Sequence, residues 1–531
     1  MKTKVILCGT HPDQFNGYSK VVFELSKELS TSYPDMELYV FGFQNFYDNI
    51  THKIGRSLPN VKDIYDAHKH EEPKAKGFGE SLINEYVLKV QPDIVVVYND
   101  LVVITNIIKK LNEIPNRKFK IVPYIDIVYK NEKNHMIQFI NDNVDGGIMF
   151  TDYWKKVIKE QGFTKPLGVL EHGFNKETFY PIPKKVARKF YNVDENSFVI
   201  VNLNRNQPRK RWDICIMSYV KFIKNHLEDN IKLMISTSLK GGWDLVDIMH
   251  SECRKNGITF EQLKRHLIII QNPQQVTDRE INVMYNVADI GINTCDGEGF
   301  GLCNFEQAGI GIPQIVPKVG GFLDFMQKSY CVMVSPQWSY YTDHSRDFVS
   351  GEAEVCSVDD FVEAMEFYYK NKKLVTKYGE KSRSVILEKY AWKDKAKQFY
   401  DIVMDFTKDH KIEESKMEDG IIDIERLMHE CNDDDVSHAV EVSDVVDSTP
   451  VPVHKEPSPP TPETTSSVQE PSKPVEVVSE PSTPDNAPLV NIDQLISEKL
   501  GEKVAPSPLK GPQIDSDDED DDEVIVIDGG S

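Results

Sequence analysis

The last quarter of this 531-residue chain has no aromatic residue, because all 25 Phe, 22 Tyr and 5 Trp lie at or before Phe406. Residues 411–531 instead hold 14 of the 29 prolines, and they carry 31 acidic side chains against 8 basic ones. Such a segment cannot bury enough apolar surface to offset the conformational entropy that folding removes. The sequence therefore predicts a long disordered acidic tail over 411–531, behind a folded body of about 410 residues.

The body lacks an excess of either charge. Residues 1–410 carry 54 basic and 53 acidic side chains, so they have no electrostatic footprint for duplex nucleic acid. No stretch approaches 18 consecutive apolar residues, the minimum expected for a spanning helix. The first 14 residues hold one short apolar run, which is typical of a buried strand and too short for a signal peptide. We expect no nucleic-acid partner and no transmembrane segment.

Cysteine is sparse, and the spacing of the cysteines indicates no paired site. The eight cysteines are scattered along the chain, and no two of them form a CxxC pair. This pattern favours buried, reduced thiols over a disulfide framework or a zinc site. Together with the lack of a targeting segment, it predicts a cytoplasmic protein.

Short apolar runs alternate with amphipathic segments throughout the body. The runs of the first part are residues 5–8, 38–43, 94–98, 121–125 and 147–150. After an interruption by glycine and proline, runs return at residues 198–203, 231–237, 267–271, 290–294, 314–317 and 332–335. Buried runs joined by helices indicate parallel strands with crossover connections. The pattern predicts an α/β protein with two Rossmann-like domains facing a cleft, residues 1–175 and 176–375, followed by helices within 376–410.

The segment 296–324, DGEGFGLCNFEQAGIGIPQIVPKVGGFLD, carries the strongest chemical signal. Three glycines follow a predicted strand and precede a helix expected over residues 302–308. Glycines let backbone N–H groups approach an anion closely, and the helix N-terminus adds partial positive charge. Glu298 lies before this helix and Glu306 is just over two turns along, so both carboxylates can face one cleft. There they can accept hydrogen bonds from the vicinal hydroxyls of a sugar or a ribose.

Two other segments add anion-binding features. Residues 202–213, NLNRNQPRKRWD, follow the first strand of the second unit and place Arg205 and Lys210 on a short loop. Fixed cations can stabilise the negative charge that develops on a departing phosphate. In the first unit, Gly17 opens a helix after the first strand, so its N–H is available to a phosphate. A solvated basic turn and an ordinary glycine turn are the alternatives for these two segments.

The sequence EGFGLCNFE resembles the Glu-x7-Glu signature of retaining glycosyltransferases of the GT-B fold, in particular glycosyltransferase family 4. The resemblance extends upstream through VTDREINVMYNVADIGINT and downstream through GIGIPQIVPKVGG, and it covers roughly residues 1–406. KYAWKDKAKQFYDIV is similar to the family's terminal helix, which implies that the helices of 376–410 pack back on the first domain. The resemblance implies transfer of a sugar from a UDP- or GDP-linked donor to a hydroxyl acceptor, with retention of configuration.

The family's site residues carry over by position. The resemblance implies that Glu306 binds the ribose hydroxyls and that Glu298, as a catalytic residue, holds the donor sugar. The backbone of the segment between them is expected to hold the same sugar through Gly299, Phe300, Gly301 and Leu302. Arg205 and Lys210 are expected to neutralise the diphosphate as catalytic residues, and Gly17 to complete the phosphate site from the first domain.

The chain departs from the family after the predicted strand at 121–125. Many members carry a histidine near the reacting sugar there, whereas this chain has VPYIDIVY, whose nearest polar group is Asp126. Asp126 is the fourth catalytic candidate, and it either bonds the donor sugar or acceptor or only caps the strand end. No DxD motif follows a predicted strand of the body, so we expect no metal and no cofactor beyond the nucleotide sugar. His172, in LEHGFN between the domains, is expected to be structural.

Two other functions stay open from the sequence. One is a nucleotide-sugar hydrolase or epimerase of the same fold, and the other is a catalytically silent interaction protein acting through its tail. In the tail, DDEVIVID surrounds the aliphatic run from Val524 to Ile527 with acids, which resembles short motifs that add a strand to a ubiquitin-like modifier. A solvated acidic terminus is the alternative for that run. Serine and threonine before proline in the tail are compatible with a eukaryotic or viral setting.

Overall fold

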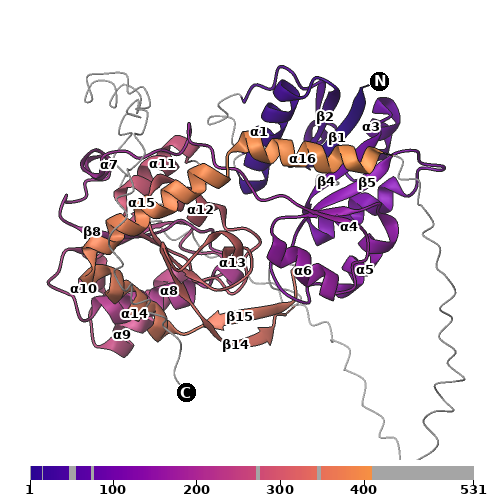
Figure 1. The fold of residues 1–531 in the computed structure, drawn as a ribbon. Coiled ribbons are helices and arrows are strands. Elements are labelled where there is room, and N and C mark those ends of the chain that lie inside the picture. The colour runs from indigo at the N-terminus through magenta and orange to yellow at the C-terminus, as the bar shows by residue number, and fades with distance from the viewer. Residues whose placement is uncertain are drawn as a thin grey trace, which may run out of the picture. The chain divides into compact units, whose positions relative to one another are not determined.

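The computed structural model describes residues 2–14, 16–46, 56–72, 77–270, 276–343 and 349–408. These residues belong to one compact unit, in which two α/β domains follow one another along the chain (Figure 1). The predicted acidic tail, including the run from Val524 to Ile527, lies outside the described residues. None of the described helices combines the length and the apolar composition that crossing a membrane requires.

The first domain is built on a seven-stranded parallel sheet in the order β3-β2-β1-β4-β5-β6-β7. Its strands are β1 (Thr3–Thr10), β2 (Met36–Phe43), β3 (Asp63–Asp66), β4 (Ile94–Asp100), β5 (Lys120–Asp126), β6 (Gly147–Met149) and β7 (Leu167–Val169). The central strands are apolar and inaccessible to solvent, as expected for a parallel sheet covered on both faces. The strand order reverses between β1 and β4, where α/β proteins open a ligand crevice at the carboxyl ends of the strands.

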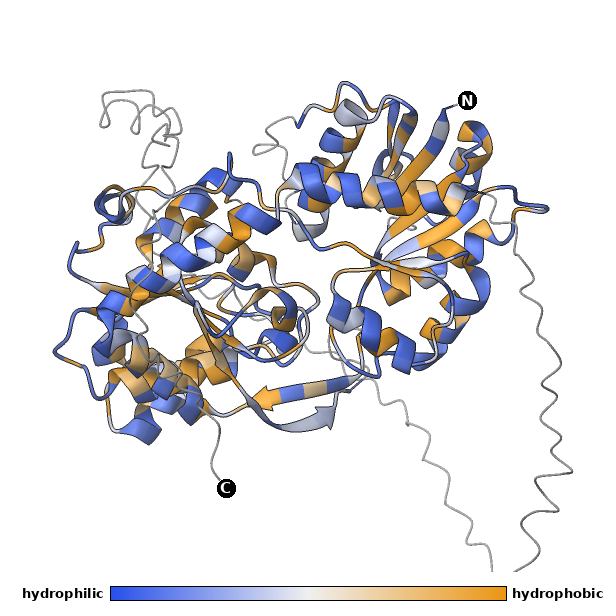
Figure 2. Cartoon of the chain, viewed as in Figure 1, coloured by the Kyte–Doolittle hydropathy of each residue, from blue (hydrophilic) through white to orange (hydrophobic). Residues whose placement is uncertain are grey.

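The helices of this domain are α1 (Gly17–Ser32), α2 (Ala67–His70), α3 (Ile83–Val90), α4 (Leu101–Leu111), α5 (Asn134–Asn143) and α6 (Asp152–Glu160). In α1, Val21, Val22 and Leu29 have no exposed surface, which gives the helix an apolar face against the sheet (Figure 2). A capping box starts it, because Asn16 Oδ1 accepts from the Ser19 N–H at 2.8 Å and Ser19 Oγ accepts from the Asn16 N–H at 3.2 Å. The helix therefore begins at Gly17, as predicted.

The second domain repeats this plan on a six-stranded parallel sheet in the order β10-β9-β8-β11-β12-β13. Its strands are β8 (Phe198–Asn202), β9 (Ile231–Ser236), β10 (Leu267–Ile270), β11 (Ile290–Ile292), β12 (Gln314–Pro317) and β13 (Cys331–Val334). Its helices are α7 (Lys184–Phe190), the 3-10 turn η2 (Pro208–Lys210), α8 (Trp212–Ile223), α9 (Leu245–Asn256), α10 (Phe260–Lys264), α11 (Asp278–Val287), α12 (Leu302–Ile310), α13 (Phe322–Phe325) and α14 (Val358–Lys370). The apolar runs predicted as strands are confirmed to within two residues at each end.

An antiparallel pair of strands, β14 (Pro336–Tyr341) and β15 (Glu352–Cys356), follows β13 and is absent from the sequence-based expectation. It meets the first domain at the loop after β5. There the Glu352 N–H donates to Lys130 O at 2.7 Å, and Lys130 Nζ lies 2.9 Å from Glu354 Oε1. The two domains are therefore in contact through β15 as well as through the chain that links them.

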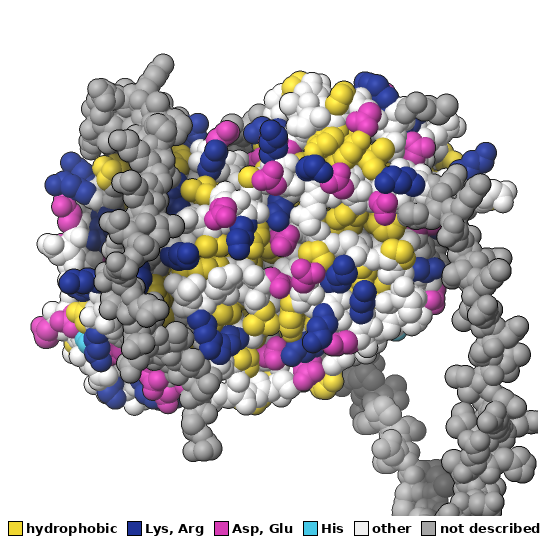
Figure 3. Space-filling view, in the orientation of Figure 1, with side chains coloured by type: hydrophobic (Ala, Val, Ile, Leu, Met, Phe, Trp, Pro, Cys, Tyr) yellow, Lys and Arg dark blue, Asp and Glu magenta, His cyan; other side chains and the backbone are white. Residues whose placement is uncertain are grey.

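Two helices end the described chain, α15 (Lys372–Lys389) and α16 (Trp392–Thr407). In α15, Ser382 Oγ donates to Ala308 O at 3.1 Å, so this helix packs on α12 of the second domain. Helix α16 instead packs on the first domain, where Tyr400 stacks on Tyr33 with ring centroids 4.1 Å apart. On the face that Figure 3 shows, Lys and Arg are interspersed with Asp and Glu, in keeping with the near-neutral composition of residues 1–410.

Candidate functional site

The glycine-rich motif follows the carboxyl end of β11 and leads directly into α12. Gly301 has a φ of +94°, a left-handed conformation that favours glycine, and a Cβ there would stand 2.4 Å from Phe322 Cε1. The loop after β12 packs on the same backbone, since the Gly321 N–H donates to Glu298 O at 3.0 Å. A side chain on either glycine would break this packing, which holds the backbone of Glu298 in place.

Glu298 is 6% exposed and is paired with cations of its own domain. Its Oε2 accepts a hydrogen bond from the Lys210 ammonium, and its Oε1 lies 3.5 Å from an Arg209 nitrogen. Burial by itself would raise the pKa of Glu298, but Lys210 and Arg209 outweigh burial and hold the pKa below its ordinary value. Glu298 is therefore ionised, and it fixes the Lys210 ammonium at the motif.

The two predicted cations of the basic loop between β8 and α8 differ in their exposure to solvent. Lys210 is buried against Glu298, whereas Arg205 is exposed and its guanidinium has no hydrogen bond or ion pair with a described residue. The loop itself is held by its backbone, because Trp212 Nε1 donates to Arg205 O at 3.2 Å. The Arg205 charge is thus available to an anion, while the Lys210 charge is already shared with a carboxylate.

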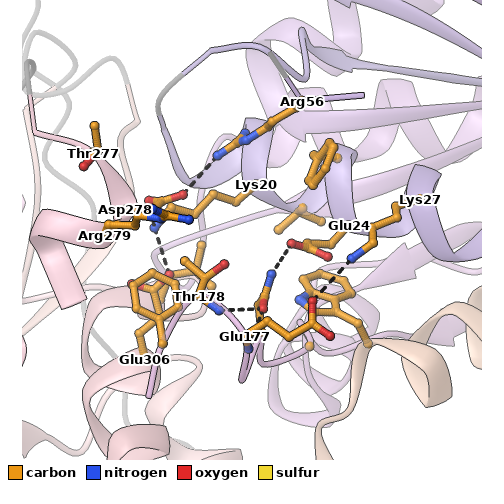
Figure 4. Close-up of a pocket in the computed structure, with 17 residues that line it drawn as sticks. Lys20, Glu24, Lys27, Arg56, Glu177, Thr178, Thr277, Asp278, Arg279 and Glu306 are labelled. Carbon is orange, nitrogen blue, oxygen red and sulfur yellow. Dashed lines mark hydrogen bonds and ion pairs between the residues drawn. The ribbon is translucent and has the colours of Figure 1, made fainter. Parts of the chain in front are cut away.

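Glu306 is 5% exposed and is bound from two sides. Its Oε1 accepts from Lys20 Nζ at 2.9 Å, and its Oε2 accepts from the Tyr285 hydroxyl at 2.9 Å. Lys20 also lies 2.8 Å from Asp278 Oδ1, and the other oxygen of Asp278 lies 3.1 Å from Arg56 (Figure 4). Burial raises the pKa of Glu306 above its ordinary value. Lys20 lowers this pKa, whereas the negative charge of the nearby Asp278 raises it.

Lys20, Arg56, Asp278 and Glu306 line a cavity of about 280 Å³ between α1 of the first domain and α11 and α12 of the second (Figure 4). Glu306 and Leu302 of the motif are in its wall, whereas Glu298 is not. A Cβ on Gly17 would stand 3.0 Å from Leu302 Cδ1, so the first residues of α1 and α12 are neighbours. The cavity therefore lies beside two helix N-termini, which together favour a negatively charged ligand.

Asp126 ends β5 and lies against the motif. Its Oδ2 accepts from the Tyr18 hydroxyl at 2.6 Å, and its Oδ1 is buried without a hydrogen-bond partner among the described residues. A Cβ on Gly299 would stand 2.1 Å from that Oδ1, so the motif backbone passes directly beside the unpaired oxygen. Burial raises the pKa of Asp126 to about 7, although Tyr18 and Arg209 lower it. Asp126 can therefore gain or lose a proton near neutral pH.

The side chain of Phe300 is turned into the protein. It is 3% exposed, and its ring lies 4.5 Å from His172, 5.0 Å from Phe305 and 4.8 Å from Phe325, measured between centroids. Only its backbone is left for contact with a ligand. His172 Nδ1 lies 3.0 Å from the Tyr124 hydroxyl, and burial lowers the pKa of His172 to about 3, so this histidine is neutral and packs as part of the core.

Sequence reasoning did not find the groups that surround Glu306. Lys20 follows Gly17 by one helical turn, and Asp278 opens α11 after a threonine cap, so each stands at a recognisable helix start. The one sequence feature that could have pointed to Lys20 is its position in the first turn of a helix whose N-terminus is expected at the cleft. No local pattern, however, connects Lys20 to a carboxylate 286 positions away.

No protein-family model and no curated protein matches the chain. Among solved structures, it is similar to sucrose-phosphate synthase from Thermosynechococcus elongatus, with a TM-score of 0.58 and 13% identity over 76% of this chain and 99% of that one. It is also similar to a glycosyltransferase from Rickettsia africae, with a TM-score of 0.55 and 14% identity over 77% and 99% of the two chains. Anabaena HepE in complex with UDP-glucose matches with a TM-score of 0.56 and 12% identity over 76% and 99%. At such identities the likeness concerns the fold, and the two Rossmann-like domains of this chain form a GT-B fold.

Proposed function

We propose that the chain is a glycosyltransferase that moves a sugar from a nucleotide sugar to a hydroxyl acceptor, with retention of configuration and without a metal. The observation that carries the proposal is the Lys210–Glu298 pair at the motif, next to the exposed Arg205 of the same loop. A nucleoside diphosphate leaves in this reaction, and fixed cations stabilise the charge that builds on it. The GT-B fold and the Glu-x7-Glu spacing of family 4 support the same activity.

In this proposal the two domains act on different parts of the donor. Lys210, held by Glu298, and Arg205 neutralise the diphosphate, and the N-terminus of α1 at Gly17 adds backbone dipoles from the other domain. Glu306 accepts hydrogen bonds from the ribose hydroxyls. Glu298 and the backbone from Gly299 to Leu302 orient the sugar at the start of α12.

The proposed reaction uses no protein nucleophile. Glu298 is tied to two cations, which makes it a poor candidate for attack on the sugar. The acceptor hydroxyl instead attacks from the side of the leaving group; the bond from C1 to the phosphate oxygen breaks as the bond from C1 to the acceptor oxygen forms. The departing diphosphate takes the acceptor's proton. Asp126, with an unpaired oxygen at the motif backbone, is positioned to hydrogen-bond the sugar or the acceptor.

A uridine-linked donor is the first one to test. The structure of Anabaena HepE contains UDP-glucose, and a structure of the trehalose-6-phosphate enzyme of E. coli contains UDP-2-fluoro glucose. Both share this fold with the present chain. The identities of 11–12% give no basis for transferring their acceptors.

The test begins with binding. Thermal unfolding with a panel of UDP-, GDP- and ADP-sugars should reveal one donor class that stabilises the protein, by ~2.7 kcal/mol at 100 times its dissociation constant. The anomeric configuration of a product made with that donor, read by NMR, tests retention, and turnover in EDTA tests the proposed independence from metal. Absence of stabilisation by every nucleotide sugar would contradict the proposal.

The same assay separates the two alternatives. Release of free sugar or conversion of the donor without any acceptor would favour a hydrolase or an epimerase. A chain truncated after His410 should keep its donor binding and turnover if the tail has no catalytic part. Loss of all measurable function on truncation would favour the interaction protein that acts through its tail.

A further inference from the structure

Lys20 crosses the boundary between the two domains. It belongs to α1 of the first domain, and its Nζ contacts two carboxylates of the second domain, Glu306 at 2.9 Å and Asp278 at 2.8 Å. Figure 4 shows it extended across the cavity toward both of them. The ammonium lies over the ring of Phe179, 4.8 Å from the ring centroid. The side chain retains 19% exposure, so solvent and small ligands reach it.

The surroundings keep this lysine charged. Burial by itself would lower the pKa of Lys20, but Asp278 and Glu306 outweigh burial and raise it. Arg56, also from the first domain, contacts the second oxygen of Asp278 at 3.1 Å. Two cations of one domain thus face two carboxylates of the other.

Lys20 stands on the side of Glu306 that a ribose has to approach. Tyr285, which binds the other oxygen of Glu306, comes from α11 of the same domain and does not line the cavity. Lys20 does line the cavity and bonds Glu306 from within it. A ribose whose two hydroxyls donate to Glu306 needs the position that the ammonium occupies.

We propose that Lys20 is a built-in competitor of the nucleotide at Glu306: it holds the two domains together across this cavity, and donor binding displaces it. This inference rests on the proposed function, because it requires that Glu306 binds the donor's ribose. In this exchange the Glu306 carboxylate loses one hydrogen bond from a charged ammonium and gains two hydrogen bonds from neutral ribose hydroxyls. Part of the donor's binding free energy is therefore spent on releasing Lys20, so donor affinity is lower than the site alone would allow.

The competing interpretation gives Lys20 the opposite effect. If Lys20 were a ligand of the donor's diphosphate, its removal would weaken nucleotide binding, as for any cation that faces a phosphate. The two interpretations therefore differ in the sign of one measured quantity, the change in nucleotide affinity when the ammonium is removed.

The experiment is calorimetric titration of the full-length protein with UDP and with GDP. Lys20→Met should bind its preferred nucleotide about fivefold or more tightly than the wild type, a typical size for coupling between a conformational contact and a ligand. Lys20→Arg retains a competing cation and should stay near the wild-type affinity. Lys20→Gln provides a second neutral variant if the methionine variant does not fold.

Lys27→Met is the matched control. Lys27 lies two turns further along α1 and lines the same cavity, but its partner is the exposed Glu177 at 3.9 Å, and it has no contact with Glu306. Its removal changes the charge of the cavity by the same amount. Nucleotide affinity should therefore stay unchanged in this variant, apart from small long-range effects.

Three results would overturn the inference. Weaker binding in Lys20→Met would make Lys20 a donor ligand, and affinity equal to the wild type would make the contact purely structural. Equal tightening in Lys20→Met and Lys27→Met would assign the effect to net charge. In each case the wild type still binds nucleotide, so the proposed function stands. Failure of wild type and neutral variants alike to bind any nucleotide would instead reject both proposals.

Discussion

The two glutamates of the motif are equally buried, with 6% of Glu298 and 5% of Glu306 exposed, yet their pKa values move in opposite directions. Burial acts on both in the same sense and favours the protonated form. Glu298 faces two cations, Lys210 and Arg209, and these lower its pKa. Glu306 shares a single cation with Asp278, and its pKa is raised.

The two glutamates also differ in whether their cations come from the same domain or from the other one. The partners of Glu298 belong to the loop after β8 in the same domain, so this pair forms whenever the second domain folds. The cation at Glu306 comes from α1 of the other domain, so that pair needs both domains in contact. The first pair is suited to a fixed part of the proposed active site, and the second is suited to change when a ligand enters.

The largest effect is expected for Lys210. In Lys210→Met the turnover number should fall by about 100-fold or more, because an oriented charge at the leaving group is lost. The variant should also lose about 3 kcal/mol of stability, since among the residues described Glu298 keeps Arg209, at 3.5 Å, as its one counter-charge. Kinetics with the best donor and urea unfolding measure the two effects.

Addition of Glu298→Gln tests the reason for the stability loss. The double variant Lys210→Met/Glu298→Gln should recover most of the stability, because no buried charge is left unpaired, but it should not recover turnover. Wild-type turnover in Lys210→Met would show that the Lys210–Glu298 pair is outside the active site.

Glu306→Ala is expected to act on binding. The ribose hydroxyls would lose a charged acceptor worth ~1.5–3 kcal/mol, which corresponds to a donor KM raised by about 10- to 100-fold. The turnover number should change little, because the ribose is bound alike before and during reaction. Glu177→Ala is the control, since that exposed carboxylate lines the same cavity. A fall in turnover at unchanged KM would contradict the assignment.

Glu132 extends the comparison, since it is buried and no cation of the described residues contacts it. It has no exposed surface, its Oε1 has no hydrogen-bond partner among the described residues, and its Oε2 accepts from the Val128 N–H at 2.9 Å. Burial raises the pKa of Glu132 to about 8, although the backbone hydrogen bonds lower it. Between about pH 4.5 and 8 the folded state therefore holds a proton that the unfolded state has released, and stability falls as the pH rises.

The variant Glu132→Gln should remove this fall. We expect it to be more stable than the wild type by at least about 1 kcal/mol at pH 8.5, and to differ little at pH 4.5. Urea unfolding across this pH range is the measurement. Equal stability of the two proteins at pH 8.5 would show that ionisation of Glu132 does not destabilise the folded state. Contact with a cation would then not be what sets the pKa of buried carboxylates in this protein.

The smallest effect is expected at His226, which lies outside the cleft. Its Nδ1 is 2.8 Å from Asp229 and its Nε2 is 2.7 Å from Glu366. Burial would lower the pKa of His226, but Glu366 and Asp229 outweigh it and raise the pKa. The stability from this raised pKa is fully present below about pH 6.5 and is lost as the pH rises through the folded-state value.

The contribution of His226 should be no more than about 1 kcal/mol, because the carboxylate partners are partly exposed. His226→Gln should be less stable than the wild type at pH 5.5, and the difference should shrink toward pH 8.5. A difference that is independent of pH would mean that the histidine contributes by packing alone.

Much of the architecture was determined by the sequence itself. The apolar runs, the start of α1 at Gly17 and the helix after the glycine motif follow from burial periodicity, from capping and from glycine backbone freedom, which act over a few neighbouring residues. The expected position of Glu306, just over two turns along its helix, is wrong: Glu298 lies before α12, so Glu306 is the fifth residue of α12, about one turn along it. The short pair β14 and β15 escaped detection because Trp338 and Tyr341 are exposed, which obscures the alternation of a half-buried strand.

The tertiary structure alone decided which charges meet. Lys210 pairs with a glutamate 88 positions away, and Lys20 with one 286 positions away on the other domain. The tertiary structure also places the Phe300 side chain inside an aromatic cluster, so that only its backbone is left for contact with the proposed donor. Such pairings depend on how loops from separate strands and two separately formed sheets come together. Local periodicity does not encode that arrangement, and the sign of a pKa shift at a buried carboxylate depends on it, because burial and neighbouring charge act against each other.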